Sequence, residues 1–355
     1  MFFWPRQLLQ ARPDAGREHL RIALNIMLVI VGLAILGKGA DVFVLAAARL
    51  AVTLRLSPVV VGAVVIGFGT GAPELLVSSL AAARGALDIA AGNVVGSNLA
   101  NLTLVLGVAG VIARPETVPR VVRREAPLSL ATVVLFALLL QGGLSRREGA
   151  VLLGALVVAV ALMLRATETA PDMVSEPEEA AAMTEFVEEL EGFIENAGEG
   201  ELTDVVAAST RRDVVRVALG LMATVAGAQL LVAGAQRIAS DAGLSGGFVG
   251  LTLVAVGTSL PELVTAIQSA RRKETALLAC NVLGSNIFNC TAVAGTAALI
   301  GPGPITDSVL TVLAATSMVA IAALAWLFLG LGGRLRRSEG IVLLGVYAAT
   351  LALIR

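Results

Sequence analysis

The sequence predicts an all-α polytopic membrane protein with ten transmembrane helices, arranged as two inverted five-helix repeats. Three observations lead to this fold class. Of the 355 residues, 57% are hydrophobic and only 15% are charged, whereas a soluble domain has about 45–50% apolar and about 25% charged residues. The apolar residues form runs of about 20, long enough to cross a bilayer core about 30 Å thick. A segment of the first half, residues 66–107, recurs without a gap at residues 254–295.

The two repeats are predicted to occupy residues 22–165 and 211–355. The first apolar run covers residues 22–37 and continues through 41–52. The remaining spans of the first repeat are expected at 57–84, 88–113, 126–141 and 147–165, and those of the second at 213–236, 245–270, 275–300, 306–331 and 338–354. Because each repeat has an odd number of spans, the second enters from the opposite side of the membrane, and equivalent helices run antiparallel.

Basic residues predict the orientation, since they gather on the cytoplasmic side. Most of the 26 Lys and Arg fall in connectors opposite the termini. We therefore expect a protein of the plasma (inner) membrane with both termini extracytoplasmic, including an N-terminal tail over residues 1–21.

The connector between the repeats, residues 166–210, is expected to be an acidic cytoplasmic loop, for it contains no Lys or Arg. Ser175, Pro177 and Glu178 form a helix-start pattern, and the apolar residues that follow repeat at helical spacing. This predicts a short amphipathic helix. A linker helix is favoured over a cation sensor, because the loop lacks the Asp-rich, Gly-centred pattern of a calcium site.

Each copy of the repeated segment places one glutamate beside a proline, in the middle of an apolar run. The copies read GTGAPE, with Glu74, and GTSLPE, with Glu262. An acid at this depth is costly and indicates function. The proline breaks the helix and frees backbone carbonyls in the turn of Thr70 or Thr258. Unwound backbone of this kind is tolerated where it is buried in protein or lines a cavity.

The ligands offered by these motifs are all oxygen, which predicts a hard cation such as Ca²⁺. We expect Glu74 and Glu262, with the carbonyls of Thr70 and Thr258, to form the calcium cage. Two carboxylates also neutralise one divalent cation. The single histidine, His19, lies outside the predicted spans, so a histidine-based metal site has no support.

A second pair of motifs, GNVVGSNLAN and CNVLGSNIFN, follows in each copy. Ser97 and Asn101 are four residues apart on one helix face, as are Ser285 and Asn289. Their hydroxyls and amides can bind a monovalent ion without adding charge. For the other asparagines of these motifs, helix–helix hydrogen bonding is favoured over ion contact: Asn93, Asn98, Asn281 and Asn286.

These paired motifs resemble the α-repeats of the cation/calcium exchanger superfamily, nearest to its prokaryotic sodium/calcium exchangers. The resemblance covers the whole ten-span plan. It implies an antiporter that exports cytosolic Ca²⁺ in exchange for Na⁺ by alternating access, with the first and sixth helices sliding across the rest. It also implies that the two glutamates are shared by both ions, and that the Na⁺ or auxiliary sites include Ser97, Asn101, Ser259, Ser285 and Asn289.

Two residues depart from the family pattern. Gly71 stands where the second copy has Ser259, and Asn289 stands where several sodium/calcium exchangers have aspartate. Both changes affect the monovalent sites, so an H⁺/Ca²⁺ antiporter that uses the same glutamates stays an alternative.

Other classes of function fit the sequence less well. A passive channel needs no inverted repeat, and an intramembrane protease would use aspartates, which both motifs lack. We therefore expect neither an enzyme nor a cofactor-binding protein. The expected partners are Ca²⁺, Na⁺ (or H⁺) and the lipid bilayer, and not nucleic acid.

Overall fold

The computed structural model of the chain describes residues 15–53, 71–115, 121–168, 199–272, 275–331 and 333–354. These residues are mostly helical, and the one β-type pairing among them is an isolated bridge between Leu144 and Gly303. By length and composition, six helical segments of this part of the chain can cross a membrane: Arg21–Ala40, Leu87–Ile112, Arg211–Ala242, Asn281–Ile300, Val309–Gly330 and Arg337–Ile354.

The first half consists of helices that follow the predicted spans closely. Helix α1 is one continuous helix, which joins the two apolar runs predicted for it. A π-helical turn, η3, connects α4 to α5, and a second one, η4, precedes α6. The bounds are α1 (Ala15–Thr53), α3 (Ala72–Ala83), α4 (Leu87–Ala100), η3 (Asn101–Val105), α5 (Leu106–Ile112), η4 (Val121–Glu125), α6 (Ala126–Leu140) and α7 (Arg146–Glu168).

From α12 to α16, the second half has the same succession of elements as the first half has from α3 to α7. Its bounds are α9 (Glu199–Ala242), α10 (Gly246–Val249), η6 (Gly250–Val254), α11 (Ala255–Thr258), α12 (Leu260–Arg272), α13 (Thr275–Phe288), η7 (Asn289–Val293), α14 (Ala294–Ile300), η8 (Val309–Ala314), α15 (Ala315–Gly330) and α16 (Arg337–Ile354). The series α13, η7 and α14 begins and ends at the positions of the repeated segment that α4, η3 and α5 occupy in the first copy. The sequence repeat is therefore also a repeat of helical irregularities.

Helix α9 differs from its predicted bounds, because it begins at Glu199 and not near residue 213. No glycine or proline interrupts residues 201–219, so the helix continues into the end of the loop predicted over 166–210. The amphipathic helix predicted within that loop and Thr70 lie outside the described residues, as does most of the tail predicted over residues 1–21.

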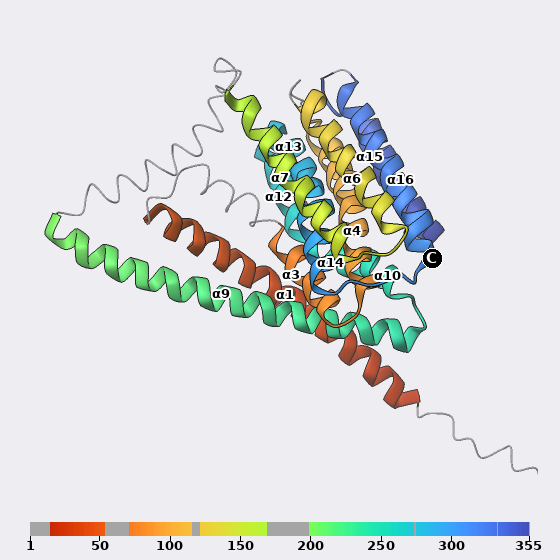
Figure 1. Ribbon diagram of the computed structural model, residues 1–355, viewed down its shortest axis with the longest axis horizontal. Helices are drawn as coiled ribbons and strands as arrows, with labels where there is room; N and C mark the ends of the chain where they lie inside the picture. Colours follow the sequence, from red (N-terminus) through yellow and green to blue (C-terminus); the bar gives the residue numbers. More distant parts are fainter. Residues whose placement is uncertain are drawn as a thin grey trace, which may run out of the picture.

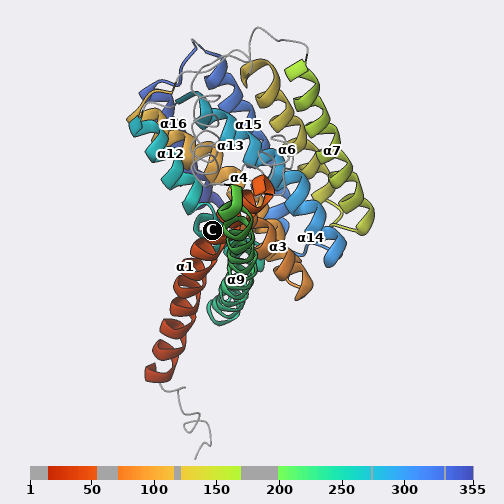
Figure 2. The same ribbon diagram turned by 90° about the vertical axis from the view of Figure 1, so that its left-hand side faces the viewer.

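Helices α1 and α9 lie side by side and cross the base of the bundle obliquely (Figures 1 and 2). They pack antiparallel through glycines. A Cβ atom at Gly32 would lie 2.6 Å from the backbone nitrogen of Leu231, and one at Gly39 would lie 2.6 Å from that of Thr224. Small residues of this kind let two membrane helices approach each other to backbone contact.

A polar contact joins the same two helices at one end. Asn25, which is buried, donates a hydrogen bond from Nδ2 to Oδ2 of Asp241 at 2.8 Å, and Arg21 lies 3.4 Å from the other oxygen of that carboxylate. The pair α1–α9 is therefore held both by close apolar packing and by a buried amide–carboxylate contact.

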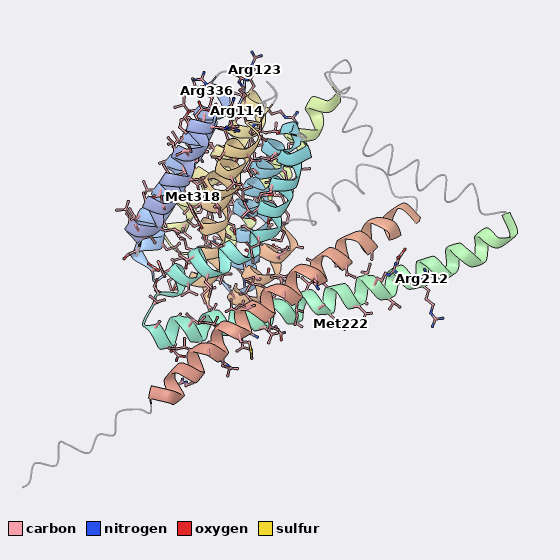
Figure 3. The ribbon with its side chains drawn as sticks, turned by 180° about the vertical axis from the view of Figure 1, so that it is seen from behind. Arg114, Arg123, Arg212, Met222, Met318 and Arg336 are labelled. Carbon is pink, nitrogen blue, oxygen red and sulfur yellow. The ribbon has the colours of Figure 1, made fainter. Side chains whose placement is uncertain are left out.

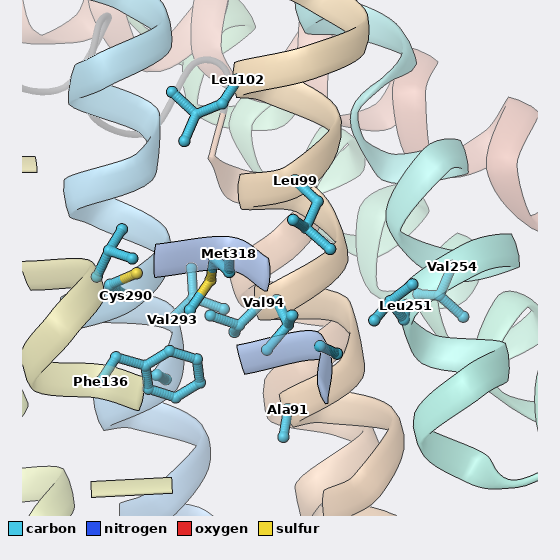
Figure 4. Close-up of a cluster of buried hydrophobic side chains, with 14 of the residues drawn as sticks. Ala91, Val94, Leu99, Leu102, Phe136, Leu251, Val254, Cys290, Val293 and Met318 are labelled. Atoms are coloured by element: carbon cyan, nitrogen blue, oxygen red, sulfur yellow. The ribbon is translucent and has the colours of Figure 1, made fainter. Parts of the chain in front are cut away.

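The hydrophobic core surrounds α4, whose residues are buried along almost its whole length. Figure 4 shows Val94 of this helix close to Met318 of α15 and Val293 of η7, with Phe136 of α6 on the same side of α4, while Leu251 of η6 lies on the other side. The helix that carries the GNVVGSNLAN motif is thus enclosed by helices of both halves.

The packing of α1 on α9 predicts a position-specific cost for a single methyl group. Gly32→Ala should lower stability by roughly 1–3 kcal/mol through overpacking. Gly37→Ala on the same helix meets no atom within 4 Å and should be neutral or slightly stabilising, because alanine favours helix. Apparent melting temperatures of the two purified variants in detergent test this. Equal melting temperatures would show that α1 and α9 are not packed this closely.

Candidate ion-binding site

Two helix starts position the two glutamates, and in the second copy a helix also precedes the start. Gly71, which precedes α3, has φ −87° and ψ −3°, and Ser259, between α11 and α12, has φ −87° and ψ 7°. Each is followed within two residues by proline, which cannot continue the hydrogen-bond ladder. The chain therefore starts a new helix in both copies, and Glu74 and Glu262 lie in the first turn of α3 and α12. The free N–H groups and the dipole at a helix start favour an anion there.

Both carboxylates are buried without a basic partner. Glu74 is 1% exposed and Glu262 is 3% exposed. The hydroxyl of Ser259, three residues before Glu262, reaches Glu74, so the two acids belong to one site. Within the described residues, neither carboxylate forms an ion pair, and Oε2 of each has no hydrogen-bond partner. A pair of buried acids in this state requires neutralisation by a cation or by protons.

A contact between the two motifs joins the halves of the chain. The hydroxyl of Ser259 donates to Oε1 of Glu74 across 3.4 Å. Next to it, Thr258 donates to Oδ1 of Asn93 at 3.2 Å, and the amide of Asn93 donates to Ser78 at 2.9 Å. The chain from Ser78 on α3 through Asn93 on α4 to Thr258 on α11 fixes three helices around the glutamates.

The polar residues of the second pair of motifs, GNVVGSNLAN and CNVLGSNIFN, are also buried. Ser97 and Asn101 are 0% and 1% exposed, while Ser285 and Asn289 are 7% and 2% exposed. Asn101 donates a hydrogen bond from Nδ2 to Oδ1 of Asn286 at 3.1 Å. The second motifs of the two copies are therefore also joined by a hydrogen bond. The hydroxyl of Ser97 and Oδ1 of Asn101 have no partner within the described residues, which leaves oxygen lone pairs available.

Two of the five π-helical turns in the described residues begin at site residues, η3 at Asn101 and η7 at Asn289. A π-helical turn inserts a residue into an α-helix and is frequent at functional sites. Sequence reasoning missed both turns, since no residue in either motif forces one.

Helix α4 packs closely on η6 and α11, and this packing brings the two sides of the site together. A Cβ atom at Gly92 would lie 3.1 Å from Cα of Gly250, and one at Gly96 would lie 2.6 Å from Cβ of Ala255. Only glycine allows this approach, which brings the helix of Ser97 against the helix that ends in Thr258.

The donor set of this site favours a hard cation. It combines two carboxylates with hydroxyl and amide oxygens, which are the ligands of Ca²⁺ and Na⁺ and not of soft metals. In the described part of the chain, no cluster of three or more His, Cys, Asp or Glu side chains exists. A bound cation would therefore take its further ligands from neutral oxygens.

The site residues predicted from the sequence can be compared with these positions. Eight of them are buried near the starts of α3 and α12 or near the π-helical turns η3 and η7: Glu74, Glu262, Thr258, Ser259, Ser97, Asn101, Ser285 and Asn289. The predicted carbonyl ligand Thr70 lies outside the described residues. Asn93 and Asn286 make hydrogen bonds between helices, in agreement with the interpretation favoured for them.

Comparison with known proteins identifies the class. The profile of the sodium/calcium exchanger protein family matches the chain twice, over residues 24–165 and 213–354. The chain therefore belongs to the sodium/calcium exchanger family, whose members are membrane transporters.

Individual relatives agree with this assignment. The chain is 36% identical to the putative antiporter CaxA of Alkalimonas amylolytica, over 89% of this chain and 94% of CaxA. It is 30% identical to the sodium/calcium exchanger MaX1 of Methanosarcina acetivorans, over 94% and 99% of the two chains. Among solved structures, the sodium-calcium exchanger NCX_Mj soaked with Na⁺ and Sr²⁺ matches with a TM-score of 0.58 and 29% identity, over 94% of this chain and 100% of that one.

The link through Asn93 predicts different effects for two asparagines of one helix. Asn93→Ala removes a bridge between three helices and should cost roughly 1–3 kcal/mol, because it leaves a buried hydroxyl unpaired. It should also reduce the rise in melting temperature that Ca²⁺ produces, because Thr258 loses its anchor. Asn98→Ala is the control, since the Asn98 amide donates to the Val94 carbonyl of its own helix and not to a neighbour of Thr258. An equal Ca²⁺ response in both variants would contradict a positioning role for Asn93.

Proposed function

We propose that this protein is a secondary-active antiporter that exports Ca²⁺ in exchange for Na⁺, with Glu74 and Glu262 as ligands shared by the two ions. The observation that carries the proposal is the burial of two carboxylates, one from each copy of the repeated motif, with no basic partner in the described residues. The names of MaX1 and NCX_Mj, a sodium/calcium exchanger in each case, support the choice of ions.

Ca²⁺ and Na⁺ are exchanged because they compete to neutralise the same two carboxylates. One Ca²⁺ neutralises both glutamates, whereas Na⁺ does so only when more than one ion binds. The additional Na⁺ ligands would come from neutral oxygens, namely Ser97, Asn101, Ser259, Ser285 and Asn289. Moving two bare carboxylates through a closed and dry state is prohibitively costly, so only a loaded site can change its access from one side to the other.

The proposed architecture is ten transmembrane helices in two inverted repeats, residues 22–165 and 211–355. The antiparallel packing of α1 on α9 supports this arrangement, because these helices open the two halves. The matching backbone angles of Gly71 and Ser259, each just before a helix that carries a glutamate, support it as well. In such a fold the carbonyls of Thr70 and Thr258 would face the same midplane cavity from opposite halves.

Alternating access would use the pair α1–α9 as the moving part. Glycine contacts hold α1 and α9 closely against each other. The pair lies obliquely against the bundle and not within it (Figure 1). A rigid helix pair that slides over the bundle would expose the site first to one side and then to the other.

We place the protein in the plasma (inner) membrane with both termini outside. Arg114, Arg123 and Arg336 gather at one end of the bundle (Figure 3), and basic residues favour the cytoplasmic side. The acidic connector between α7 and α9 would then also be cytoplasmic.

Uptake of ⁴⁵Ca²⁺ into proteoliposomes tests the function. At fixed membrane voltage, an outward Na⁺ gradient should drive uptake, and an outward H⁺ gradient should not. Uptake driven only by H⁺ would contradict Na⁺ coupling and assign the protein to H⁺/Ca²⁺ exchange through the same glutamates. Uptake without any opposing gradient would indicate a channel.

Glutamate substitutions test the shared site in the same assay. Glu74→Gln or Glu262→Gln removes one of two charges and should reduce uptake to the level of empty liposomes. Glu148→Gln is the matched control, because Glu148 is a partly exposed acid that caps the start of α7 through the Ser145 N–H, a bond that glutamine can also accept. Normal uptake by either site variant would exclude the shared-carboxylate mechanism.

A further inference from the structure

Four arginines line one pocket. Figure 3 shows two of them, Arg114 and Arg336, at the end of the bundle away from the α1–α9 pair. The pocket has a volume of about 290 Å³ and is lined by Arg114, Arg334, Arg336, Arg337 and Ser338. Arg114, Arg334 and Arg336 come from two connectors that are distant in the sequence, and Arg337 and Ser338 begin α16. The ion-binding site involves none of them.

The backbone holds the two connectors together. Arg114 ends α5 with a left-handed φ of 52°, which turns the chain sharply. The following Pro115 then accepts a hydrogen bond from the Leu335 N–H at 2.9 Å. The Leu335 side chain is fully buried, against Gly110 of α5 and the start of α16. The arginines on either side of this anchor are therefore brought to one place by ordered backbone.

Their positive charge is uncompensated in the described part of the chain. No carboxylate there lies within ion-pair distance of the four guanidinium groups. Glu339, two residues after Arg337, is buried and accepts a hydrogen bond from the Arg336 N–H at 2.7 Å, so it caps α16. Glu116, two residues after Arg114, lies outside the described residues. The start of α16 adds the positive end of a helix dipole to the same place. An anion in the pocket would relieve the repulsion between these charges.

Apolar surface continues from the pocket along the helices. Ile112 of α5 is 42% exposed, and Ile341 and Val342, just beyond the pocket on α16, are 62% and 47% exposed. Both helices belong to segments that can cross a membrane. A free anion would make no contact with this apolar surface. A phospholipid carries a charged phosphate next to its acyl chains, which matches the position of the pocket next to the apolar residues.

We propose that this pocket binds the phosphate of an anionic phospholipid, with the acyl chains against the exposed apolar residues of α5 and α16. Arginine is suited to phosphate, since its planar fork can donate two hydrogen bonds at once. Basic pockets between membrane helices are known to recognise anionic headgroups. The proposal does not depend on which ions the protein exchanges.

Native mass spectrometry of the detergent-purified protein tests the proposal with dioleoylphosphatidylglycerol and dioleoylphosphatidylcholine as probes. The wild type should retain one phosphatidylglycerol in preference to phosphatidylcholine. Arg334→Gln with Arg337→Gln should weaken this binding roughly tenfold or more, given the contribution of each basic residue near a membrane surface. Arg211→Gln with Arg212→Gln is the matched control, because it removes two exposed arginines of α9 outside the pocket and should leave the preference intact.

Two results would overturn the proposal. Equal loss of phosphatidylglycerol in both double variants would mean that the lipid responds to overall charge and not to the pocket. Stabilisation of the wild type by inorganic phosphate, absent in the Arg334/Arg337 variant and without any preference for phosphatidylglycerol, would assign the pocket to a free anion and exclude the lipid. Melting temperatures of the two double variants, compared with that of the wild type, show that each is folded.

Discussion

The constraint on which this structure depends is the burial of two carboxylates near each other in an apolar protein. Uncompensated, a buried charge costs many kcal/mol. The chain reduces that cost without supplying a basic partner. Each of Glu74 and Glu262 opens a helix, where free N–H groups favour an anion, and Ser259 donates to Glu74. A cation or protons have to neutralise the remaining charge of the two carboxylates. The two buried acids therefore form a binding site for these ions.

Irregular helices are the means by which the chain builds this site. Prolines lie at the starts of the helices that carry the glutamates, and π-helical turns begin at Asn101 and Asn289. Between the irregular segments, glycines of α4 bring backbones together, so that Asn93 reaches Thr258. The polar groups that the irregularities release are therefore enclosed by close packing and do not face lipid, as a membrane protein requires.

The sequence predicted the helix bounds of the fold well and the contacts of the site only in part. Apolar runs and prolines are local signals, so α4 to α5, α13 to α14 and the break at Ser259 lay where expected. The start of α9 at Glu199 was missed, because apolar length marks the membrane span and not the whole helix. The pairing of Asn101 with Asn286 was also not foreseen, since it depends on how two helices are rotated against each other. The close-packed Gly32 and Gly39 of α1 gave no periodic signal that distinguished them from Gly37.

The central claim is that one divalent cation is held by both glutamates at once. A crystal structure of the protein with Sr²⁺, a Ca²⁺ analogue that scatters X-rays anomalously, tests it most directly. We predict a single anomalous peak that contacts oxygens of both Glu74 and Glu262, at roughly the 2.3–2.6 Å of calcium sites, and that disappears when Na⁺ replaces Sr²⁺. A peak bound to only one of the two glutamates, or a peak that persists unchanged at saturating Na⁺, would contradict the shared-carboxylate account.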